Sequence, residues 1–568
     1  MNTTYWGRVF FYPLLMKWRE GIDRLEKDRL KQTLPDIRAI IDPPVLQRDN
    51  ENYHINLLLK NEGESTSEGV FLKYEICNLN RKKIHTSESK LKIDKEIGVQ
   101  KSITVKLSIP SQITRENDAI FLLLCVTPIY ENKKTETKNF DFTLEKQSES
   151  HLAYDEIPWN ETKIPPKYLF KGREDILNRL VKHFDSINRN KTYILYGLTR
   201  TGKSSILIYL SEHLDGKQTN IDSKAFRIIT FHWKLDLASS QENASDMWAH
   251  LLHNCILNRL EELAKNKIIS YESIPELKNE SKARFRDWYR IISYLNKKLI
   301  YPIFLIDEFS HYKNLVDKRR IDSSFLAAIR SFAIDGLAGF VFSGTYDLKE
   351  LIRDPDYGIT GQLVNTIELQ VSQINTKAAI ELINVIQDKL KFTDDAIKHI
   401  LKLSANIPYF IQILCKNCAN YAVESKKRII GYPEVELVTK ILTGEDKSQE
   451  ESMIEVLPPG TFMNNQFDPK DPSSISALIS SICYFNKNEI DARGVNYSEI
   501  QELWGKKAIP GFAPKLAEAI NYLKTKGILN EVVDEGMSIY KISVDLFRRW
   551  WGIQHSNIEL ELDPLRGD

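Results

Sequence analysis

The pattern of apolar and polar positions changes several times along the chain, and each change predicts a different kind of structure. Residues 1–37 are amphipathic and rich in charge, which predicts a helical segment. From residue 38 to 147, short alternating or apolar runs are separated by polar turns, and this pattern is typical of an all-β sandwich. The predicted strands are the run that begins at Tyr53 and the segments 70–76, 100–109, 119–130 and 135–144.

A polar stretch at residues 148–167 contains three prolines and predicts a linker into a region of different pattern. From 168 to 370, apolar runs alternate with helical patterns, which indicates a parallel sheet with crossover helices. The predicted strands are 192–196, 227–231, 303–306, 339–342 and 366–370, with long helices at 241–265 and 281–298. The sequence therefore predicts an α/β domain in the middle of the chain.

The rest of the chain reads as mostly helical. Residues 371–445 have a continuous helical pattern, and we call the predicted structure the lid. A second linker is expected at 446–473, followed at 474–555 by three helices and a hairpin, the arrangement of a winged helix, and by an acidic tail at 556–568. The predicted fold class is a multidomain chain with an N-terminal all-β sandwich, an α/β core with a parallel sheet, a helical lid and a C-terminal winged helix.

Composition and charge narrow the possible functions. The chain has 568 residues, of which 42% are hydrophobic and 27% charged, as in ordinary globular proteins. Lys and Arg number 78 against 77 Asp and Glu, so a uniformly basic nucleic-acid coat is excluded. The six Cys are scattered, which argues against a disulfide framework and for a reducing, cytoplasmic compartment. No uncharged apolar run approaches the roughly 20 residues of a membrane span, so we expect no membrane contact.

A phosphate-binding motif follows the first predicted strand of the α/β region. The segment from Gly197 to Ser204 reads Gly-Leu-Thr-Arg-Thr-Gly-Lys-Ser and fits the pattern G-x-x-x-x-G-K-[ST]. In such a loop backbone N–H groups cradle the phosphates, Lys203 reaches the β- and γ-phosphates, and the Ser204 hydroxyl binds Mg²⁺. An apolar strand precedes the loop and a helix follows it, which places the anion at a helix N-terminus. The predicted nucleotide-binding residues here are Gly197, Leu198, Thr199, Arg200, Thr201, Gly202, Lys203, Ser204 and Ser205.

Two carboxylates end a later apolar strand of the same region. Asp307 and Glu308 follow Ile-Phe-Leu-Ile, so they are predicted at the carboxyl end of a buried strand, where open α/β sheets bind ligands. Asp307 is expected to hold Mg²⁺ through water, and Glu308, with Lys203, is the predicted catalytic residue because it would polarise the attacking water. A third strand ends in Ser343 and Thr345, either of which could sense the γ-phosphate, although a simple strand cap explains them almost equally well.

These motifs and their order resemble a known family. The chain contains, in this order, Phe170-Lys-Gly-Arg-Glu, the phosphate loop, the Asp-Glu strand, Phe342-Ser-Gly-Thr and Asn406-Ile-Pro-Tyr. This order resembles that of STAND ATPases, near the archaeal-type group that is related to origin-recognition AAA+ proteins. The resemblance spans about 168–551 and implies Mg²⁺ with ATP as the cofactor. It also implies that Gly172 and Arg173 lie on the adenine side of the nucleotide and that Pro408 of the lid contacts it. The family usually has Gly where this chain has Asn406, and Asn tolerates the left-handed conformation better than most residues. The sandwich separately resembles immunoglobulin-like domains, through the segments 59–66 and 69–72.

The resemblance implies an ATP-hydrolysing molecular switch that signals, for instance in prokaryotic antiphage defence, through conformational change and assembly. We expect protein partners at the sandwich and self-assembly. One alternative is an ATP-dependent DNA-binding loader that uses the winged helix, and a second is a nucleotide-binding scaffold with little turnover. Residues 471–568 hold 11 Lys and Arg against 14 Asp and Glu, a net charge of −3, and this disfavours the DNA alternative. Glu308 argues against the scaffold.

Other residues were weighed as sites and given plainer explanations. Cys415 and Cys418 are expected to be buried helix cysteines, because nothing completes a zinc site around them. The basic run 426–428 is expected to be a solvated helix end. Trp550 and Trp551 are expected in a core. No arginine finger can be assigned among Arg319, Arg320, Arg330 and Arg353.

Overall fold

The computed structural model describes most of the chain. The chain forms two compact units. Described are residues 34–41, 45–49, 52–79, 81–86, 91–109, 113, 119–146, 152–159, 165–184, 192–221, 224–235, 251–270, 285–317, 324–353, 366–445, 472–486, 493–506, 512–525, 527–534 and 536–554. The first unit combines Met1–Ile157 with Ile386–His399 and Lys416–Val438, and the second combines Pro158–Val385, Ile400–Cys415 and Thr439–Asp568. Most of the predicted N-terminal helix and second linker, and all of the acidic tail, lie outside the described residues. Among the helices described, none is both long and apolar enough to cross a membrane.

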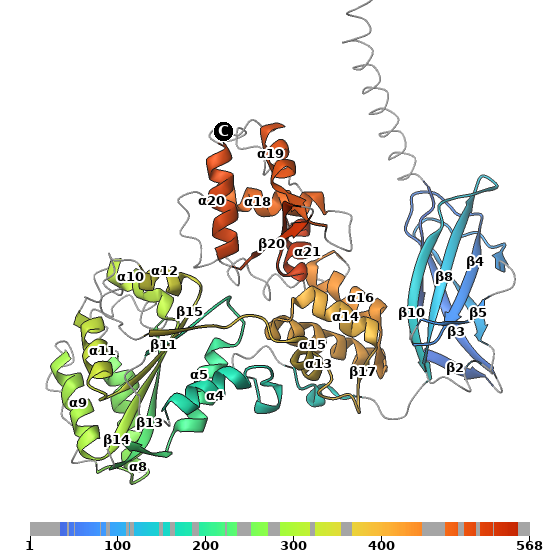
Figure 1. Cartoon of the computed structure of the whole chain (residues 1–568). Helices are drawn as coiled ribbons and strands as arrows, with labels where there is room; N and C mark the ends of the chain where they lie inside the picture. The colour runs from blue at the N-terminus through green and yellow to red at the C-terminus, as the bar shows by residue number, and fades with distance from the viewer. Residues whose placement is uncertain are drawn as a thin grey trace, which may run out of the picture. The chain divides into compact units, whose positions relative to one another are not determined.

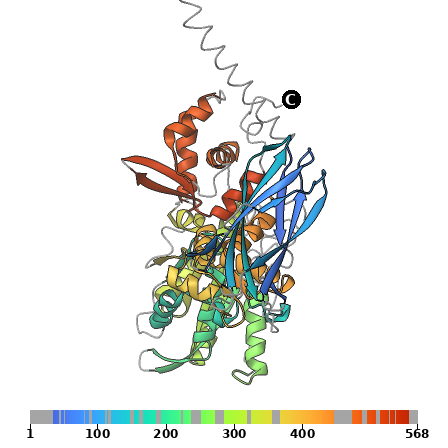
Figure 2. The ribbon, with the colours of Figure 1, turned by 90° about the vertical axis from the view of Figure 1, so that its right-hand side faces the viewer.

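The first unit contains a β-sandwich, as the alternating pattern predicts (Figure 2). One layer is formed by β1, β3, β2 and β7 and the other by β10, β8 and β4 with β5, β6 and β9; β2 joins the layers, because it pairs antiparallel with β3 and parallel with β10. The strands are Ile37–Ile41, Val45–Asp49, Asn52–Asn61, Gly69–Cys77, Lys83–Thr86, Leu91–Ile93, Ser102–Ile109, Ala119–Tyr130, Lys133–Lys134 and Lys138–Lys146, from β1 to β10. Inward residues of both layers, such as Leu57 and Leu122, share one apolar core.

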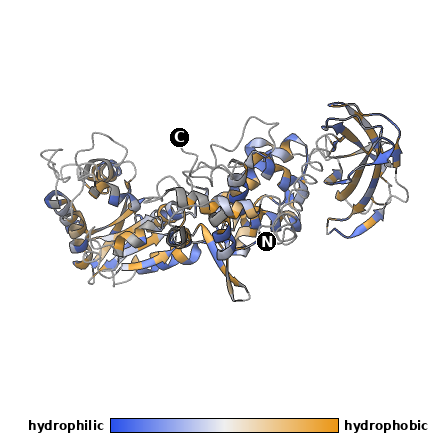
Figure 3. Cartoon of the chain, turned by 90° about the horizontal axis from the view of Figure 1, so that it is seen from above, coloured by the Kyte–Doolittle hydropathy of each residue, from blue (hydrophilic) through white to orange (hydrophobic). Residues whose placement is uncertain are grey.

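The second unit contains the α/β core. Its six-stranded sheet has the order β12-β13-β14-β15-β11-β16, in which only the edge strand β12 is antiparallel (Figure 1). The strands are Thr192–Tyr196 (β11), Gln218–Ile221 (β12), Lys224–Lys234 (β13), Ile300–Asp307 (β14), Gly339–Gly344 (β15) and Thr366–Gln370 (β16). All five predicted strands are present, and β12 was not predicted. The strands are predominantly apolar, as Figure 3 shows, because helices cover both faces of the sheet.

Two sets of helices cover the sheet. Helices α4 (Glu174–Phe184) and α5 (Lys203–Leu214) pack on one face, in a core that includes Leu305 and Val341. On the other face lie α8 (Asn258–Lys265), α9 (Phe285–Lys297) and α11 (Ser324–Ile334), in a core that includes Phe304. Helices α10 (Tyr312–Asp317) and α12 (Asp347–Arg353) follow β14 and β15 along the chain and lie beyond the carboxyl ends of these strands (Figure 1). Alternate residues of each strand therefore belong to different cores, and those at odd positions of β14 share the face of α5.

The lid consists of four helices and a short ladder. The helices are Thr376–Ile383 (α13), Asp394–Ser404 (α14), Pro408–Glu424 (α15) and Tyr432–Thr443 (α16), and Lys391–Phe392 (β17) pairs with Ile429–Ile430 (β18). Both Cys415 and Cys418 are buried in α15 as free thiols, as expected, and no group of metal-ligating side chains occurs among the described residues. The prediction for residues 426–428 is wrong at Lys427, whose side chain is fully buried and paired with Glu434.

The C-terminal part of the second unit has the elements of a winged helix. They are α18 (Pro472–Phe485), β19 (Val495–Asn496), α19 (Tyr497–Lys506), α20 (Phe512–Thr525), β20 (Leu529–Asp534), β21 (Met537–Ile542) and α21 (Asp545–Gln554). The three strands form an antiparallel sheet of order β19-β21-β20. Trp550 and Trp551 are buried, as expected for core residues.

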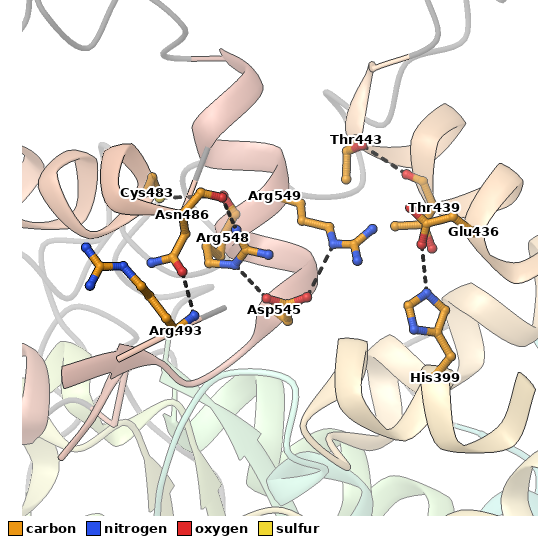
Figure 4. Close-up of polar contacts among 10 residues, drawn as sticks. All are labelled: His399, Glu436, Thr439, Thr443, Cys483, Asn486, Arg493, Asp545, Arg548 and Arg549. Atoms are coloured by element: carbon orange, nitrogen blue, oxygen red, sulfur yellow. Dashed lines mark hydrogen bonds and ion pairs between the residues drawn. The ribbon is translucent and has the colours of Figure 1, made fainter. Parts of the chain in front are cut away.

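A buried polar network fixes the last helix of this part. Arg548 donates to Asp545 (2.6 Å) and to the carbonyl oxygen of Asn486 (3.1 Å), and Arg549 also donates to Asp545 (Figure 4). Since Arg548 and Asp545 are both nearly inaccessible to water, each charge depends on the other for compensation. The network therefore holds α21 against the end of α18.

Candidate nucleotide-binding site

The phosphate loop lies between β11 and α5, and its glycines are required by the backbone. Gly202 precedes α5 with φ 93°, a left-handed conformation that glycine adopts without strain. A Cβ on Gly197 would lie 2.2 Å from the carbonyl oxygen of Val371, so any larger residue would displace the backbone. Within the loop, the Thr201 hydroxyl donates to the carbonyl oxygen of Leu198 at 2.8 Å. The loop is thus shaped by its own residues and by the segment after β16.

Lys203 lies at the centre of this loop. Its ammonium group donates to the carbonyl oxygens of Gly197 (3.0 Å) and Leu198 (2.6 Å). Burial lowers the pKa of Lys203 to about 8, although the neighbouring Glu308 and Asp307 act in the opposite direction. A cation held near two carboxylates and two carbonyl groups is suited to an anionic phosphate. Ser204 is half-buried beside it, and Ser205 is buried.

The acid pair lies at the carboxyl end of β14. Asp307 is almost fully buried, and one of its oxygens accepts hydrogen bonds from the Ser343 hydroxyl and from the backbone N–H of Glu308 (3.0 Å). Glu308 has φ 55°, an uncommon conformation for a residue other than glycine. Burial first, and then the charge of Asp307, raise the pKa of Glu308. The structure therefore brings the predicted acids and Lys203 into one electrostatic cluster.

The two predicted sensor residues have different neighbours. Ser343 is the penultimate residue of β15, which pairs with β14, and its hydroxyl donates a hydrogen bond to Asp307. Thr345 is instead bound to Ser310, whose hydroxyl lies 3.0 Å from the Thr345 hydroxyl and accepts from its N–H at 2.8 Å. Ser310 was not singled out from the sequence, where a serine after an acid pair gives no signal. Of the two, Ser343 is the one in contact with the acid pair.

Arg173 contacts the phosphate loop through hydrogen bonds. Its guanidinium is buried and donates to the carbonyl oxygens of Thr201 (2.9 Å) and Ser372. Burial lowers the pKa of Arg173 to about 10, and its buried Nε–H has no partner among the described protein atoms. Gly172 precedes it with φ 70°, and a Cβ there would lie 2.8 Å from that of Ala378. These two residues thus connect the loop with the start of the lid.

The lid meets the loop at the N-terminus of α15. Pro408 is the first residue of this helix, and Asn406 before it has φ 57°, the left-handed conformation expected where the family usually has glycine. The next residue, Tyr409, lies beneath the guanidinium of Arg200, 4.4 Å from the ring centre to the Arg200 carbon. Such a contact is a cation–π interaction. Tyr409 was not among the predicted site residues, although it is part of the Asn-x-Pro-Tyr motif.

The arginine-finger candidates stay unassigned. Arg319 and Arg320 lie outside the described residues, and for Arg353 only the backbone is described. Arg330 is half-buried on α11.

The strand–loop–helix unit, the parallel sheet and the acid pair at its carboxyl edge form an α/β fold of the phosphate-loop type. Two solved structures are similar to this chain over most of their own length. Cdc6p from Pyrobaculum aerophilum is 16% identical and covers 70% of this chain and 95% of its own, with a TM-score of 0.31. The Thermotoga maritima RuvB Holliday junction branch migration motor is 14% identical and covers 66% and 96%, also with a TM-score of 0.31.

A third solved structure matches a smaller part of the chain. A CARDB domain from Pyrococcus furiosus, solved in complex with di-metal ions, is 15% identical and covers 19% of this chain and 88% of its own, with a TM-score of 0.13. No family model and no curated protein matches the chain. Similarity at these TM-scores carries no function from those proteins to this one.

Proposed function

We propose that the chain is an ATP-binding and ATP-hydrolysing molecular switch of the STAND type. The observation that carries the proposal is the convergence of Lys203, Asp307 and Glu308 at the carboxyl edge of one sheet. Lys203 would bind the β- and γ-phosphates, and Ser204 and Asp307 would hold Mg²⁺, which supplies charge neutralisation at the transferred phosphoryl group. Their oxygen atoms are the ligand type that Mg²⁺ prefers.

Glu308 is the proposed general base. Its raised pKa favours proton acceptance from a water molecule, because a carboxylate with a higher pKa is a stronger base. Ser343 would keep Asp307 oriented through its hydrogen bond, and Gly172, Arg173 and Pro408 would line the nucleotide from the loop and lid sides. A role in signalling or antiphage defence, with self-assembly and a protein partner at the sandwich, extends the proposal by resemblance alone.

ATP hydrolysis by the purified chain tests this function. Glu308→Gln should still bind ATP·Mg²⁺ but lose turnover by on the order of a hundredfold or more. Glu212→Gln, at an exposed carboxylate near the C-terminal end of α5, is the control and should leave turnover unchanged. Tight ATP binding without turnover in the wild type would favour the scaffold alternative, and absent binding would reject the nucleotide site itself.

The DNA-loader alternative is less well supported by the winged helix. Leu516, Ile520 and Leu523 of α20 are buried in its own core, so they are not available to a groove. Three apolar side chains of the hairpin are exposed, Val532, Val533 and Met537. Duplex DNA recruits Lys and Arg to its phosphates. Submicromolar, salt-sensitive binding to random duplex DNA would nevertheless revive this alternative.

A further inference from the structure

The outer face of the second sandwich layer is covered by the lid within the first unit. Phe121, Thr143 and Glu145 are buried although they point away from the sandwich core, because their strand neighbours Leu122 and Leu144 occupy that core. A Cβ added to Gly431 of the lid would lie 2.3 Å from the Thr143 hydroxyl and 2.9 Å from the Phe121 ring. The fit is therefore close enough that a single methyl group would disturb it.

Polar groups are exchanged across this contact in both directions. The buried ammonium of Lys427 donates to the carbonyl oxygen of Thr143 on β10 and to Glu434 on α16 (2.6 Å). In return, the Glu145 carboxylate on β10 accepts from the backbone N–H groups of Arg428 and Ile429. Separating the two surfaces would break the hydrogen bonds of Lys427 to Thr143 and of Arg428 and Ile429 to Glu145. The contact is thus a specific one.

Arg81 anchors the edge of the same contact. It forms ion pairs with Asp141 of β10 (3.6 Å) and with Asp395 of α14 (2.9 Å). Its guanidinium also lies over the rings of Phe121 and Tyr432, at 5.2 Å and 5.5 Å. One arginine therefore contacts both the sandwich and two helices of the lid.

Helix α15 links this contact to the phosphate loop along the chain. Its 17 residues form a continuous helix, roughly 25 Å long, that begins at Pro408 beside Tyr409 and Arg200. At its other end, Lys426 adopts φ 53° and the N–H of Lys427 donates to the carbonyl oxygen of Ala422 (2.8 Å). This closing turn is of the Schellman type and directs Lys427 into the sandwich contact.

We propose that the sandwich is a regulatory arm of the lid, and that its contact with residues 427–434 is coupled through α15 to nucleotide binding at the phosphate loop. The inference rests on the proposed function and adds that the contact between the sandwich and the lid regulates nucleotide binding through α15. Coupling is reciprocal: a ligand that shifts the sandwich changes nucleotide affinity, and nucleotide changes the affinity for that ligand by the same factor.

The test compares Arg81→Ala with Lys83→Ala. Both residues are partly exposed and ion-paired, but Lys83 pairs with Glu75 inside the sandwich, 2.8 Å away, and has no described contact with the lid. Gly431→Ala is a second perturbing variant, with Gly552→Ala as its control, because a Cβ on Gly552 meets only Cys483 at 3.8 Å. Hydrogen exchange of the whole chain is measured without nucleotide, and the affinity for a fluorescent ATP analogue is measured separately.

Arg81→Ala and Gly431→Ala should speed amide exchange at least threefold at residues 427–434 and also at 405–415, and should change analogue affinity at least threefold. The control variants should do neither. Faster exchange confined to 427–434 would overturn the coupling, as would unchanged affinity. If the wild type binds no analogue, the proposed function fails, whereas the exchange at 405–415 still decides whether the sandwich contact reaches that end of α15.

Discussion

Glu145 allows a sharp prediction, because its carboxylate is buried between the sandwich and the lid. Burial is the largest cause of its altered acidity and raises its pKa to about 7, against an ordinary 4.5. Lys427 and the N–H groups of Arg428 and Ile429 lower the pKa, and Glu434 raises it further. Glu145→Gln keeps an oxygen acceptor for those N–H groups but cannot ionise. The variant therefore removes the titration and preserves the contact.

The sign and size of the effect follow from linkage. The closed contact binds a proton more tightly than the opened one, so its stability is highest at low pH and falls as pH rises from about 4.5 to about 7. For those two pKa values, the loss between pH 5 and pH 7 is about 2 kcal/mol, or roughly 40-fold in the opening equilibrium. Above pH 7 the effect levels off, since Glu145 is then ionised in both states.

Hydrogen exchange of the amides of residues 428–430, corrected for intrinsic rates, measures this opening directly. Protection in the wild type should decline across pH 5 to 7, and in Glu145→Gln it should stay nearly constant. Amides of β11 in the second unit serve as the internal control. A flat profile in the wild type, or the same decline in both proteins, would refute the assignment of the buried carboxylate.

Three further predictions concern the phosphate loop and the acid pair. Lys203→Ala should abolish ATP binding because it removes the cation at the centre of the loop, and titration with a fluorescent analogue that gave wild-type affinity would contradict this. Ser343→Ala should weaken Mg²⁺-dependent binding several-fold and leave Mg²⁺-free binding unchanged, since only the orientation of Asp307 is lost; calorimetry with and without Mg²⁺ measures both. Gly197→Ala should lower the free energy of unfolding by about 1–3 kcal/mol and abolish ATP binding, because its Cβ would meet the Val371 carbonyl oxygen. A thermal unfolding midpoint equal to that of the wild type would contradict this.

The local features of the fold were predictable, and the long-range contacts were not. The phosphate loop and the strand before Asp307 could be identified because their chemistry depends on consecutive residues. Strands β1 and β2 were not predicted, although β11 and β16, which are also five residues long, were. Lys427 was expected at a solvated helix end, because no local pattern indicates that a strand 284 residues earlier covers it.

One signal for the covered face was present in the sequence. Residues 119–126 are apolar without a charged or polar break. A strand with one solvated face would instead alternate between apolar and polar residues. This run therefore indicates a strand that is covered on both faces, but it does not identify the covering residues. Their identification as Gly431 and its neighbours required the three-dimensional structure.

The interleaving of the two units has a consequence for synthesis of the protein. The chain leaves the first unit at Ile157 and completes it only at Val438. Glu145 and Arg428 are 283 residues apart, so at 5–20 residues per second the ribosome needs roughly 15 to 60 s to produce the partner of β10. During that time Phe121 and its neighbours face water or a chaperone. The nascent sandwich is therefore a waiting intermediate whose apolar face is exposed to aggregation until the lid emerges.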